Sequence, residues 1–401
     1  MKLTKYKLGE ILDVTRGASL SGEFYATEGK YIRLTCGNFD YQNNCFKENK
    51  SKDNLYYVGD FKSDFLMEEG DIITPLTEQA IGLLGSTAII PESGKYIQSQ
   101  DVAKIICKEE LLDKDFAFYL ISSTLVKQQL SAAAQQTKIR HTSPDKIRDC
   151  TVWIPELAEQ KRIGKLLRSL DRKIELNRAI NQNLEAMAKQ LYDYWFVQFD
   201  FPNKDGKPYK SSGGEMVWNE KLKRMIPKEW TNANIYQLAS ISKETVNPQA
   251  QPNELFKHYS LPEYDKTGTY AEEYGIDIQS AKFIVTNNCI LVSKLNPWTS
   301  RVICGNRGSN QICSTEFVVW NPASLKTKGF LFMLAKSAKF IEYCTQGATG
   351  TSHSHRRINP ELMMKFDFPY NSEIAIKFSL LIENIIVHLH NNIAQLKVLT
   401  E

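Results

Sequence analysis

The segment FAFYLISS at residues 116–123 returns as FLFMLAKS at residues 330–337, with the same residue at four of its eight positions. One match of this length carries little weight, because a chain of 401 residues offers a very large number of window pairs. Further matches in the same order along the chain decide whether the similarity has structural meaning.

Such matches occur from the first residues to the last. Their separations range from 227 residues (Leu8 to Ile235) to 214 residues (Phe116 to Phe330), and the order never breaks. They are LGEILDV (8–14) with IYQLASI (235–241), GDIITP (70–75) with NCILVS (288–293), SQDVAKI (99–105) with STEFVVW (314–320), and Arg140 and Pro144 with Arg356 and Pro360. The pattern predicts two diverged copies of one unit; two unrelated domains with similar patterning are the alternative.

Each copy has the same internal order. Short alternating segments such as KYIRLTC (30–36) and GDIITPL (70–76) predict strands, and DFAFYLISSTLVKQQLSAAAQ (115–135) predicts a helix before a polar loop and a proline. Strands followed by helices within each copy favour an α+β fold with two similar globular α/β units.

After each copy the apolar period changes to that of a long helix. Between 163 and 195, apolar residues recur at alternating spacings of four and three, and the opposite face is basic. The predicted helix seam comprises Ile163, Leu167, Leu170, Ile174, Asn177 and Leu184, with Phe378, Leu381, Ile385 and Leu389 at the end of the chain. We expect the two helices to pack on each other; the alternative is that each packs on its own domain.

These patterns divide the chain into five parts. We expect a first domain at 1–152, a spacer helix at 153–198, a Gly/Pro/Ser/Lys-rich linker at 199–230, a second domain at 231–370 and a second spacer helix at 371–401.

Composition limits the class of protein. The chain has 42% hydrophobic and 24% charged residues and a net charge of +4, without an apolar run of membrane-spanning length or a secretory signal. We therefore expect a cytoplasmic protein. Its eight cysteines form no CxxC pair, and no histidine pair has metal-ligand spacing, so we expect reduced thiols and no metal site.

The sequence offers no catalytic constellation. It has no phosphate-binding GxxxxGK[ST] loop and no GxGxxG motif. Residues 296–298 (NPW) resemble part of an adenine-binding methyltransferase loop, but the second proline is missing, and a turn is the simpler interpretation. We expect no catalytic residue in this chain.

Two polar loops occur at matching places in both copies. TPLTEQAIGLLGST (74–87) matches SKLNPWTSRVICGNRGS (293–309), and QQTKIRHTSP (135–144) matches GATGTSHSHRRINP (347–360). Arg, Lys, His, Thr, Ser, Gln and Asn are the side chains that contact phosphates and base edges. The loops are therefore candidate nucleic-acid contacts; ordinary solvated loops are the alternative.

Residues 153–203 (WIPELAEQKRIGKLLRSLDRKIELNRAINQNLEAMAKQLYDYWFVQFDFPN) resemble the central conserved region of type I restriction-modification specificity subunits. GEMVWNEKLKRMIPKEW (214–230) resembles the entry to their second recognition domain, and GDIITP their recurring Gly-Asp-Ile segment. The second copy departs from this pattern with Asn288-Cys289 in place of Gly70-Asp71.

The resemblance implies two target-recognition domains arranged as a pseudo-two-fold tandem repeat and separated by an antiparallel coiled-coil helix pair. Each domain would read one half of a bipartite, asymmetric DNA target. It also implies two methyltransferase subunits, which use S-adenosylmethionine, and motor-nuclease subunits, which use ATP and magnesium. The chain itself would need no cofactor.

On this resemblance the polar loops become candidate DNA contacts. The candidates are Thr77, Gln79, Thr137, Lys138, Arg140 and His141 in the first copy, and Lys294, Trp298, Arg301, Arg307, His353, His355, Arg356 and Arg357 in the second. Three other interpretations stay open: a stand-alone methyltransferase or nuclease, a coiled-coil adaptor that binds only protein, and a subunit of a methylation-only system.

Overall fold

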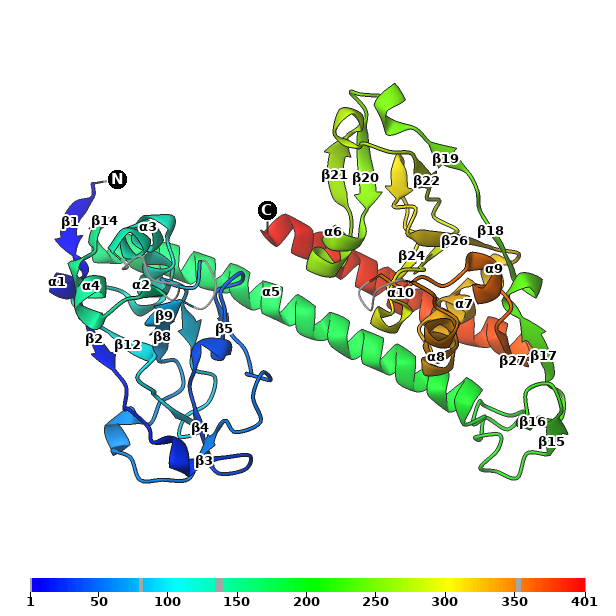
Figure 1. Cartoon of the computed structure of the whole chain (residues 1–401), viewed down its shortest axis with the longest axis horizontal. Helices are drawn as coiled ribbons and strands as arrows, with labels where there is room; N and C mark the ends of the chain where they lie inside the picture. Colours follow the sequence, from blue (N-terminus) through cyan, green and yellow to red (C-terminus); the bar gives the residue numbers. More distant parts are fainter. Residues whose placement is uncertain (1, 79–81, 134–139, 351–354, 401) are drawn as a thin grey trace. The chain divides into compact units, whose positions relative to one another are not determined.

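The computed structural model describes residues 2–78, 82–133, 140–350 and 355–400. They form two compact units, Met1–Arg172 and Lys173–Glu401 (Figure 1). Both units mix helices and strands.

The first unit is built from short strands and four helices before a long one. Its strands are β1 (Thr4–Lys7), β2 (Leu12–Arg16), β3 (Tyr25–Ala26), β4 (Tyr31–Arg33), β5 (Phe39–Asp40), β6 (Cys45–Phe46), β7 (Tyr56–Tyr57), β8 (Ile72–Pro75), β9 (Thr77–Glu78), β10 (Ala88–Ile89), β11 (Tyr96–Ile97), β12 (Val102–Cys107), β13 (Arg140–His141) and β14 (Thr151–Ile154). Its helices are α1 (Leu8–Ile11), α2 (Lys114–Ile121), α3 (Thr124–Ala133), α4 (Pro144–Asp149) and the first part of α5 (Leu157–Tyr192).

The second unit has the rest of α5 and a similar series. Its strands are β15 (Met216–Asn219), β16 (Arg224–Pro227), β17 (Thr231–Asn234), β18 (Ala239–Ile241), β19 (Thr245–Val246), β20 (Leu255–Tyr259), β21 (Ala271–Tyr274), β22 (Lys282–Ile284), β23 (Ile290–Ser293), β24 (Val302–Cys304), β25 (Gln311–Cys313), β26 (Phe317–Pro322) and β27 (Asp367–Tyr370). Its helices are α6 (Leu261–Thr267), α7 (Lys328–Ala335), α8 (Ala338–Gln346), α9 (Pro360–Met363) and α10 (Ser372–Thr400).

The central sheets of the two units have the same strand order. In the first unit the antiparallel order is β10-β8-β12-β2, and in the second it is β24-β23-β26-β18. The register also agrees, because Ile72 lies opposite Ile105 where Ile290 lies opposite Trp320. A parallel pair (β4 with β11, β20 with β25) and an outer antiparallel pair (β1 with β14, β17 with β27) recur as well.

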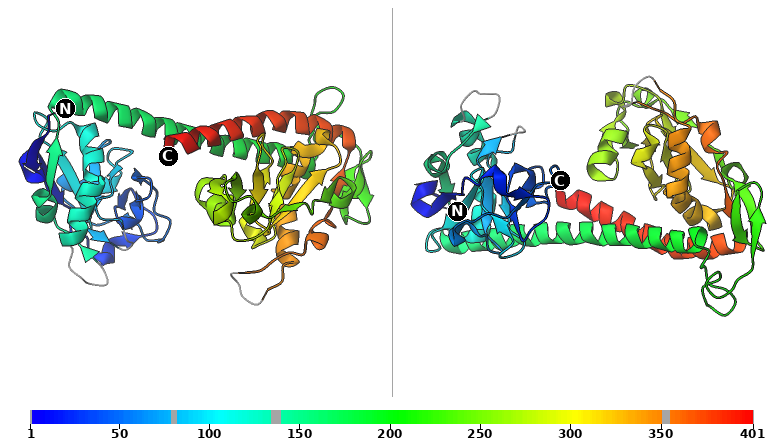
Figure 2. Two further views of the ribbon diagram at one scale, coloured as in Figure 1. Left: turned by 90° about the horizontal axis from the view of Figure 1, so that it is seen from above. Right: turned by 60° about the horizontal axis from the view of Figure 1, so that its bottom comes forward.

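Side chains along each central strand point alternately to the two faces of the sheet, and each face packs into its own hydrophobic core. Ile72 packs with α2 and α3, whereas its neighbour Ile73 packs toward the second sheet. Ile290 likewise packs with α7 and α10, and Leu291 packs with Tyr259 of β20. Successive side chains of a strand point to opposite faces, so each central sheet lies between a helical layer and a second sheet (Figure 2).

A long helix packs on the helical layer of each unit. In the first unit, Gly164 of α5 lies directly on the start of α2, where an added Cβ would be 2.7 Å from the backbone nitrogen of Phe116. The Tyr119 hydroxyl of α2 also donates to Asp171 of α5 at 2.6 Å. In the second unit, Gly329 of α7 faces Ser379 of α10, whose hydroxyl accepts from the Phe330 backbone nitrogen at 2.9 Å.

Within the second unit, the last part of α5 packs against α10. Asn177 pairs with Gln395 and Asn181 with Asn392, so the two helices run antiparallel there. Asn177 is buried, as the helix seam predicted, although a polar residue stands at that position. Tyr192 and Phe378 close the other end of the contact, with ring centroids 6.0 Å apart.

The predicted helix seam is partly wrong. Phe378 and Leu389 are buried and Ile163, Leu167, Ile174, Leu184 and Ile385 are partly buried, but Leu170 and Leu381 are exposed. Ile382 and Ile386 are buried on α10 instead. On α10 the reason is that this helix packs on α7 as well as on α5, so its buried face is wider than the narrow stripe of a two-helix seam.

Two predicted segment boundaries differ from the observed elements. The boundary at 152 cuts β14, whose residues Trp153 and Ile154 pair with β1 and belong to the first unit. Residues 199–230 are not a simple linker, because β15 pairs with β16 and Phe199, Phe201 and Trp230 are buried. Aromatic stacking overrides the Gly/Pro/Ser/Lys-rich composition: the Phe201 and Trp230 rings stack with centroids 5.1 Å apart.

None of the eight cysteines forms a disulfide, and six of them are buried. In the described part of the chain, none of the helices combines the length and apolar character that a membrane span requires.

Candidate nucleic-acid interface

In the first unit, the described residues of the two polar loops meet in a short ladder. β13 pairs with β9, which places Arg140 opposite Glu78 and His141 opposite Thr77. One residue further, the Thr142 backbone nitrogen donates to the Leu76 carbonyl at 2.9 Å. The short ladder therefore joins segments that are about 60 residues apart in sequence.

The second unit joins its polar loops at the matching residues. Leu295 forms a β-bridge with Arg357, and the Ile358 backbone nitrogen donates to the Lys294 carbonyl at 3.0 Å. The Asn296 backbone nitrogen also donates to the Arg356 carbonyl at 2.8 Å. The backbone crossing thus has the same form in both units.

A carboxylate residue lies beneath each crossing, just before a central strand. The Asp101 carbonyl accepts from the Leu76 nitrogen at 2.8 Å, and the Glu316 carbonyl accepts from the Lys294 nitrogen at 2.9 Å. Sequence reasoning missed both acids because it did not consider carboxylate side chains as part of the candidate interface. Both acids are the third residue of the matched segments SQDVAKI (99–105) and STEFVVW (314–320), and this shared position was the available signal.

In the first unit, Thr77 lies between the acid, Asp101, and the loop residue His141. The Thr77 hydroxyl is 3.3 Å from Asp101 Oδ1 and 3.4 Å from His141 Nδ1. The exposed His141 ring is therefore linked to the acid through a buried hydroxyl.

Arg140 lies at the edge of the same ladder. Its guanidinium donates to Ser131 Oγ at 2.9 Å and is 3.6 Å from the buried carboxylate of Glu78. Glu78 also accepts from the Gly82 backbone nitrogen at 2.8 Å, so this carboxylate connects the two sides of the loop.

In the second unit the acid binds the arginine directly. Glu316 accepts from Arg357 Nε at 2.9 Å and from Arg357 Nη2 at 3.0 Å. These hydrogen bonds raise the pKa of Arg357. The side chain is 45% exposed, so it is fixed on one side and open on the other.

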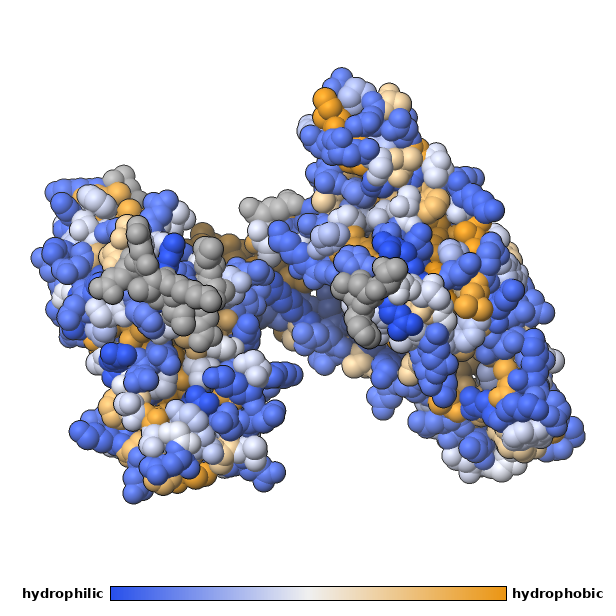
Figure 3. Space-filling model, in the orientation of Figure 1, coloured by the Kyte–Doolittle hydropathy of each residue, from blue (hydrophilic) through white to orange (hydrophobic). Residues whose placement is uncertain are grey.

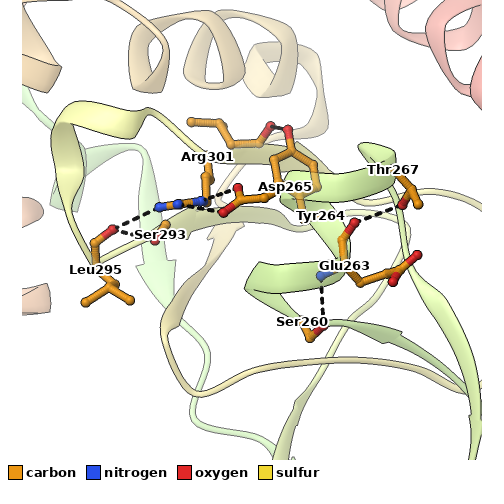
Figure 4. Close-up of polar contacts among 9 residues, drawn as sticks. Ser260, Glu263, Tyr264, Asp265, Thr267, Ser293, Leu295 and Arg301 are labelled. Carbon is orange, nitrogen blue, oxygen red and sulfur yellow. Dashed lines mark hydrogen bonds and ion pairs between the residues drawn. The ribbon is translucent and has the colours of Figure 1, made fainter. Parts of the chain in front are cut away.

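Arg301 also has a carboxylate partner, but in a different setting (Figure 4). Asp265 of α6 accepts from its Nε at 2.6 Å and from its Nη2 at 2.8 Å, and the Leu295 carbonyl accepts from its Nη1 at 3.4 Å. Only 12% of this side chain is exposed. The structure therefore places Arg301 in a polar network that holds α6 against the loop.

The other candidates of the second unit lie around the crossing. Trp298 is 44% exposed in a short helical turn, Pro297–Thr299, flanked by positive φ angles at Asn296 and Ser300. Arg356 donates to the Ala348 carbonyl, whereas Lys294 is partly buried and Arg307 and His355 are exposed. Gln79, Thr137, Lys138 and His353 lie outside the described residues.

The surroundings of the loops are polar. Hydrophilic residues cover most of the face of each unit that is seen in Figure 3. Among residues 2–78, 82–133, 140–350 and 355–400, no three His, Cys, Asp or Glu side chains gather as metal ligands. Donors and acceptors arranged around an open surface suit recognition of a polar polymer.

Comparison with known proteins agrees with these features. The model of the type I restriction modification DNA specificity domain matches residues 2–186. Two curated relatives from Methanocaldococcus jannaschii are the specificity subunits of the type I restriction enzymes MjaVIII, 29% identical over 127 residues, and MjaIX, 24% identical over 165 residues. These matches cover 31% and 41% of this chain but only 30% and 35% of the relatives, so the chain matches about a third of their length.

A solved structure extends the likeness to the fold of the whole chain. The S subunit of the type I restriction-modification system from M. genitalium has a TM-score of 0.63 and 14% sequence identity, with 100% of this chain and 94% of that chain covered. At this identity the likeness concerns the fold alone. Residues 2–186 thus match the specificity domain, the curated relatives are specificity subunits of type I restriction enzymes, and the whole chain resembles a solved S subunit in fold.

Proposed function

We propose that this chain is the sequence-specific DNA-binding subunit of a type I restriction-modification complex. Each unit reads one half of a bipartite, asymmetric target through its crossed polar loops. The chain contributes no catalytic group and binds no cofactor. Methyltransferase subunits supply the S-adenosylmethionine chemistry, and motor-nuclease subunits use ATP and magnesium.

The observation that supports this proposal best is that both units have the same backbone crossing between their polar loops but carry different side chains there. The crossing hydrogen bonds join Thr142 to Leu76 in one unit and Ile358 to Lys294 in the other. At the paired positions, however, Thr77 and His141 stand in the first unit where Leu295 and Arg357 stand in the second. We infer that the units are diverged copies of one scaffold that present two different sets of donors and acceptors, as two unlike half-sites require.

The helices have the length that the proposal needs. α5 has 36 residues, which corresponds to about 54 Å at 1.5 Å per residue. Half-sites read from one face of DNA are roughly 34 Å apart, or one helical turn. In this proposal α5 and α10 form the antiparallel spacer that sets the distance between half-sites and carries the docking sites for methyltransferase subunits.

Mapping methylated adenines in cells with and without the gene tests the proposal. One bipartite motif with an unread spacer should disappear when the gene is removed and return when it is restored. Loss of DNA cleavage as well would distinguish a complete restriction system from a methylation-only one. A methylome that does not change would refute the proposal.

Single-loop variants test the assignment of one half-site to each unit. We expect Arg140→Ala to weaken or relax recognition of one half-site and Arg356→Ala to do so at the other. The change should be read from the methylated motif and from binding of the purified chain to duplexes altered in one half. Equal loss at both halves would contradict the assignment.

A further inference from the structure

Arg357 and Arg301 both form a bidentate pair with a carboxylate, but only the guanidinium of Arg357 keeps a second edge open. Glu316 takes Nε and Nη2, while no described residue accepts from Nη1. At 45% exposure, the side chain still reaches solvent. The open Nη1–Nη2 edge therefore presents two parallel donors in a fixed plane.

The plane is anchored to the sheet and not to the loop alone. Glu316 directly precedes β26, its backbone nitrogen donates to Ser314 Oγ at 3.2 Å, and its carbonyl accepts from Lys294 at 2.9 Å. The Arg357 backbone is held on its other side by two hydrogen bonds with Thr349, of 2.8 and 2.9 Å. Little conformational freedom is left to lose on binding, which favours a specific contact.

We propose that Arg357, positioned by Glu316, reads a guanine in the half-site bound by the second unit. This inference rests on the proposed function. Two parallel donors match the O6 and N7 acceptors that guanine presents in the major groove. Adenine places an amino donor beside N7, cytosine presents an amino donor and thymine a single carbonyl, so a fixed arginine edge discriminates against all three.

Arg301 provides the comparison within the same unit. It has the same bidentate arrangement with a carboxylate, but its Nη1 is used by the Leu295 carbonyl and its side chain is only 12% exposed. Both edges of that guanidinium are occupied, so it has no donor pair left for a base. An arginine–carboxylate pair alone is thus insufficient, and the open edge makes the difference.

In the first unit, the position that matches Arg357 does not carry an arginine held by a carboxylate. His141 stands there, and Thr77 lies between it and Asp101. We therefore assign the guanine contact to one half-site only, the half whose recognition changes in Arg356→Ala.

The test uses the full-length protein and duplexes that carry its methylated motif. Each guanine of the two half-sites is replaced in turn by 7-deazaguanine, which lacks the N7 acceptor. At one guanine of the second unit's half-site, the wild-type protein should lose affinity by roughly 10- to 100-fold, the range of a bidentate base contact. Arg357→Ala should bind both duplexes equally, because the contact is already lost.

Two further variants separate the roles of the pair. Arg357→Lys keeps the charge but not the planar donor pair, so discrimination should fall while the salt dependence of binding stays the same. Glu316→Gln should also lower discrimination, because the guanidinium plane is no longer fixed. Glu215→Gln, which breaks the exposed 2.8 Å pair with Lys228 in the same unit, is the matched control and should behave as wild type.

The outcomes distinguish the inference from the proposed function. The protein could bind its motif and still lose as much affinity on 7-deazaguanine substitution in Arg357→Lys and Arg357→Ala as in wild type. In that case only the guanine inference fails. It also fails if that half-site contains no guanine. If the protein does not bind the motif at all, the proposed function fails.

Discussion

The side-chain amide of Asn392 on α10 donates to Asn181 Oδ1 on α5 at 3.0 Å. One turn away along α5, Asn177 donates to Gln395 at 3.2 Å, and Asn177 is only 7% exposed. Leaving such an amide buried without a partner costs about 1–3 kcal/mol. These pairs therefore favour one register and the antiparallel direction over arrangements that would separate them.

Replacing Asn181 and Asn392, singly and together, should show that the two side chains stabilise the protein as a pair. We expect Asn181→Ala and Asn392→Ala to lower the free energy of unfolding by about 1 kcal/mol each, with a coupling energy of about 0.5–1.5 kcal/mol in a double-mutant cycle. Urea denaturation measures all four proteins. Asn181→Ala combined with Glu383→Ala, an exposed position elsewhere on α10, should be additive; additivity of the Asn181–Asn392 pair would show that the pair is not coupled.

Lengthening α5 should change the spacer of the DNA target. A helical heptad inserted between Arg172 and Lys173 keeps the Tyr119–Asp171 contact of one unit and the Asn177–Gln395 contact of the other. It adds about 10 Å at 1.5 Å per residue, which is roughly three base pairs of DNA. Methylome mapping should show a longer spacer with unchanged half-sites, whereas Arg172→Lys alone should keep the original spacer. An unchanged spacer in the insertion variant would contradict the proposal that α5 sets the distance between half-sites.

The contact between α5 and α2 should not tolerate a side chain at residue 164. Alanine favours helix over glycine by about 1 kcal/mol, but its Cβ would be 2.7 Å from the Phe116 backbone nitrogen. Because backbone yields less easily than a side chain, we expect Gly164→Ala to destabilise the first unit by about 1–3 kcal/mol. Calorimetry measures the effect. Gly22→Ala, whose Cβ would be no closer than 3.9 Å to any other group, should have a smaller effect; equal effects would contradict the close approach.

The buried thiols of the first unit should make it less stable at alkaline pH. Burial raises the pKa of Cys36 and of Cys150 from 9.0 to about 11. Between pH 9 and pH 11 the unfolded chain loses these protons while the folded unit keeps them. Stability is therefore complete below pH 9 and falls as the pH rises toward 11, by at most about 2.7 kcal/mol per thiol.

Urea denaturation under reducing conditions at pH 8 and pH 10.5 measures this loss. Cys36→Ala and Cys150→Ala should lower stability at pH 8, because each removes buried volume, and should also reduce the difference between the two pH values. A difference as large as that of wild type would show that these thiols do not cause the alkaline loss.

Sequence by itself determined the order of the main elements, although the one helix predicted at 115–135 is two helices, α2 and α3. FAFYLISS and FLFMLAKS are the helices α2 and α7, and GDIITP and NCILVS hold the central strands β8 and β23. These segments were predictable because apolar period and chain order are local properties. The predicted helices also exist, since α5 and α10 span 36 and 29 residues.

Only the tertiary structure decided which faces are buried and which side chains are available. Leu381 is exposed and Ile382 buried because α10 packs on α7 as well as on α5, and residues 199–230 are ordered by aromatic stacking that composition conceals. The sequence does not distinguish Arg301 from Arg357. In the structure, however, Asp265 and Leu295 occupy both edges of the Arg301 guanidinium, whereas Glu316 occupies only one edge of the Arg357 guanidinium. The partners of a guanidinium come from distant parts of the chain, and the fold alone brings them together.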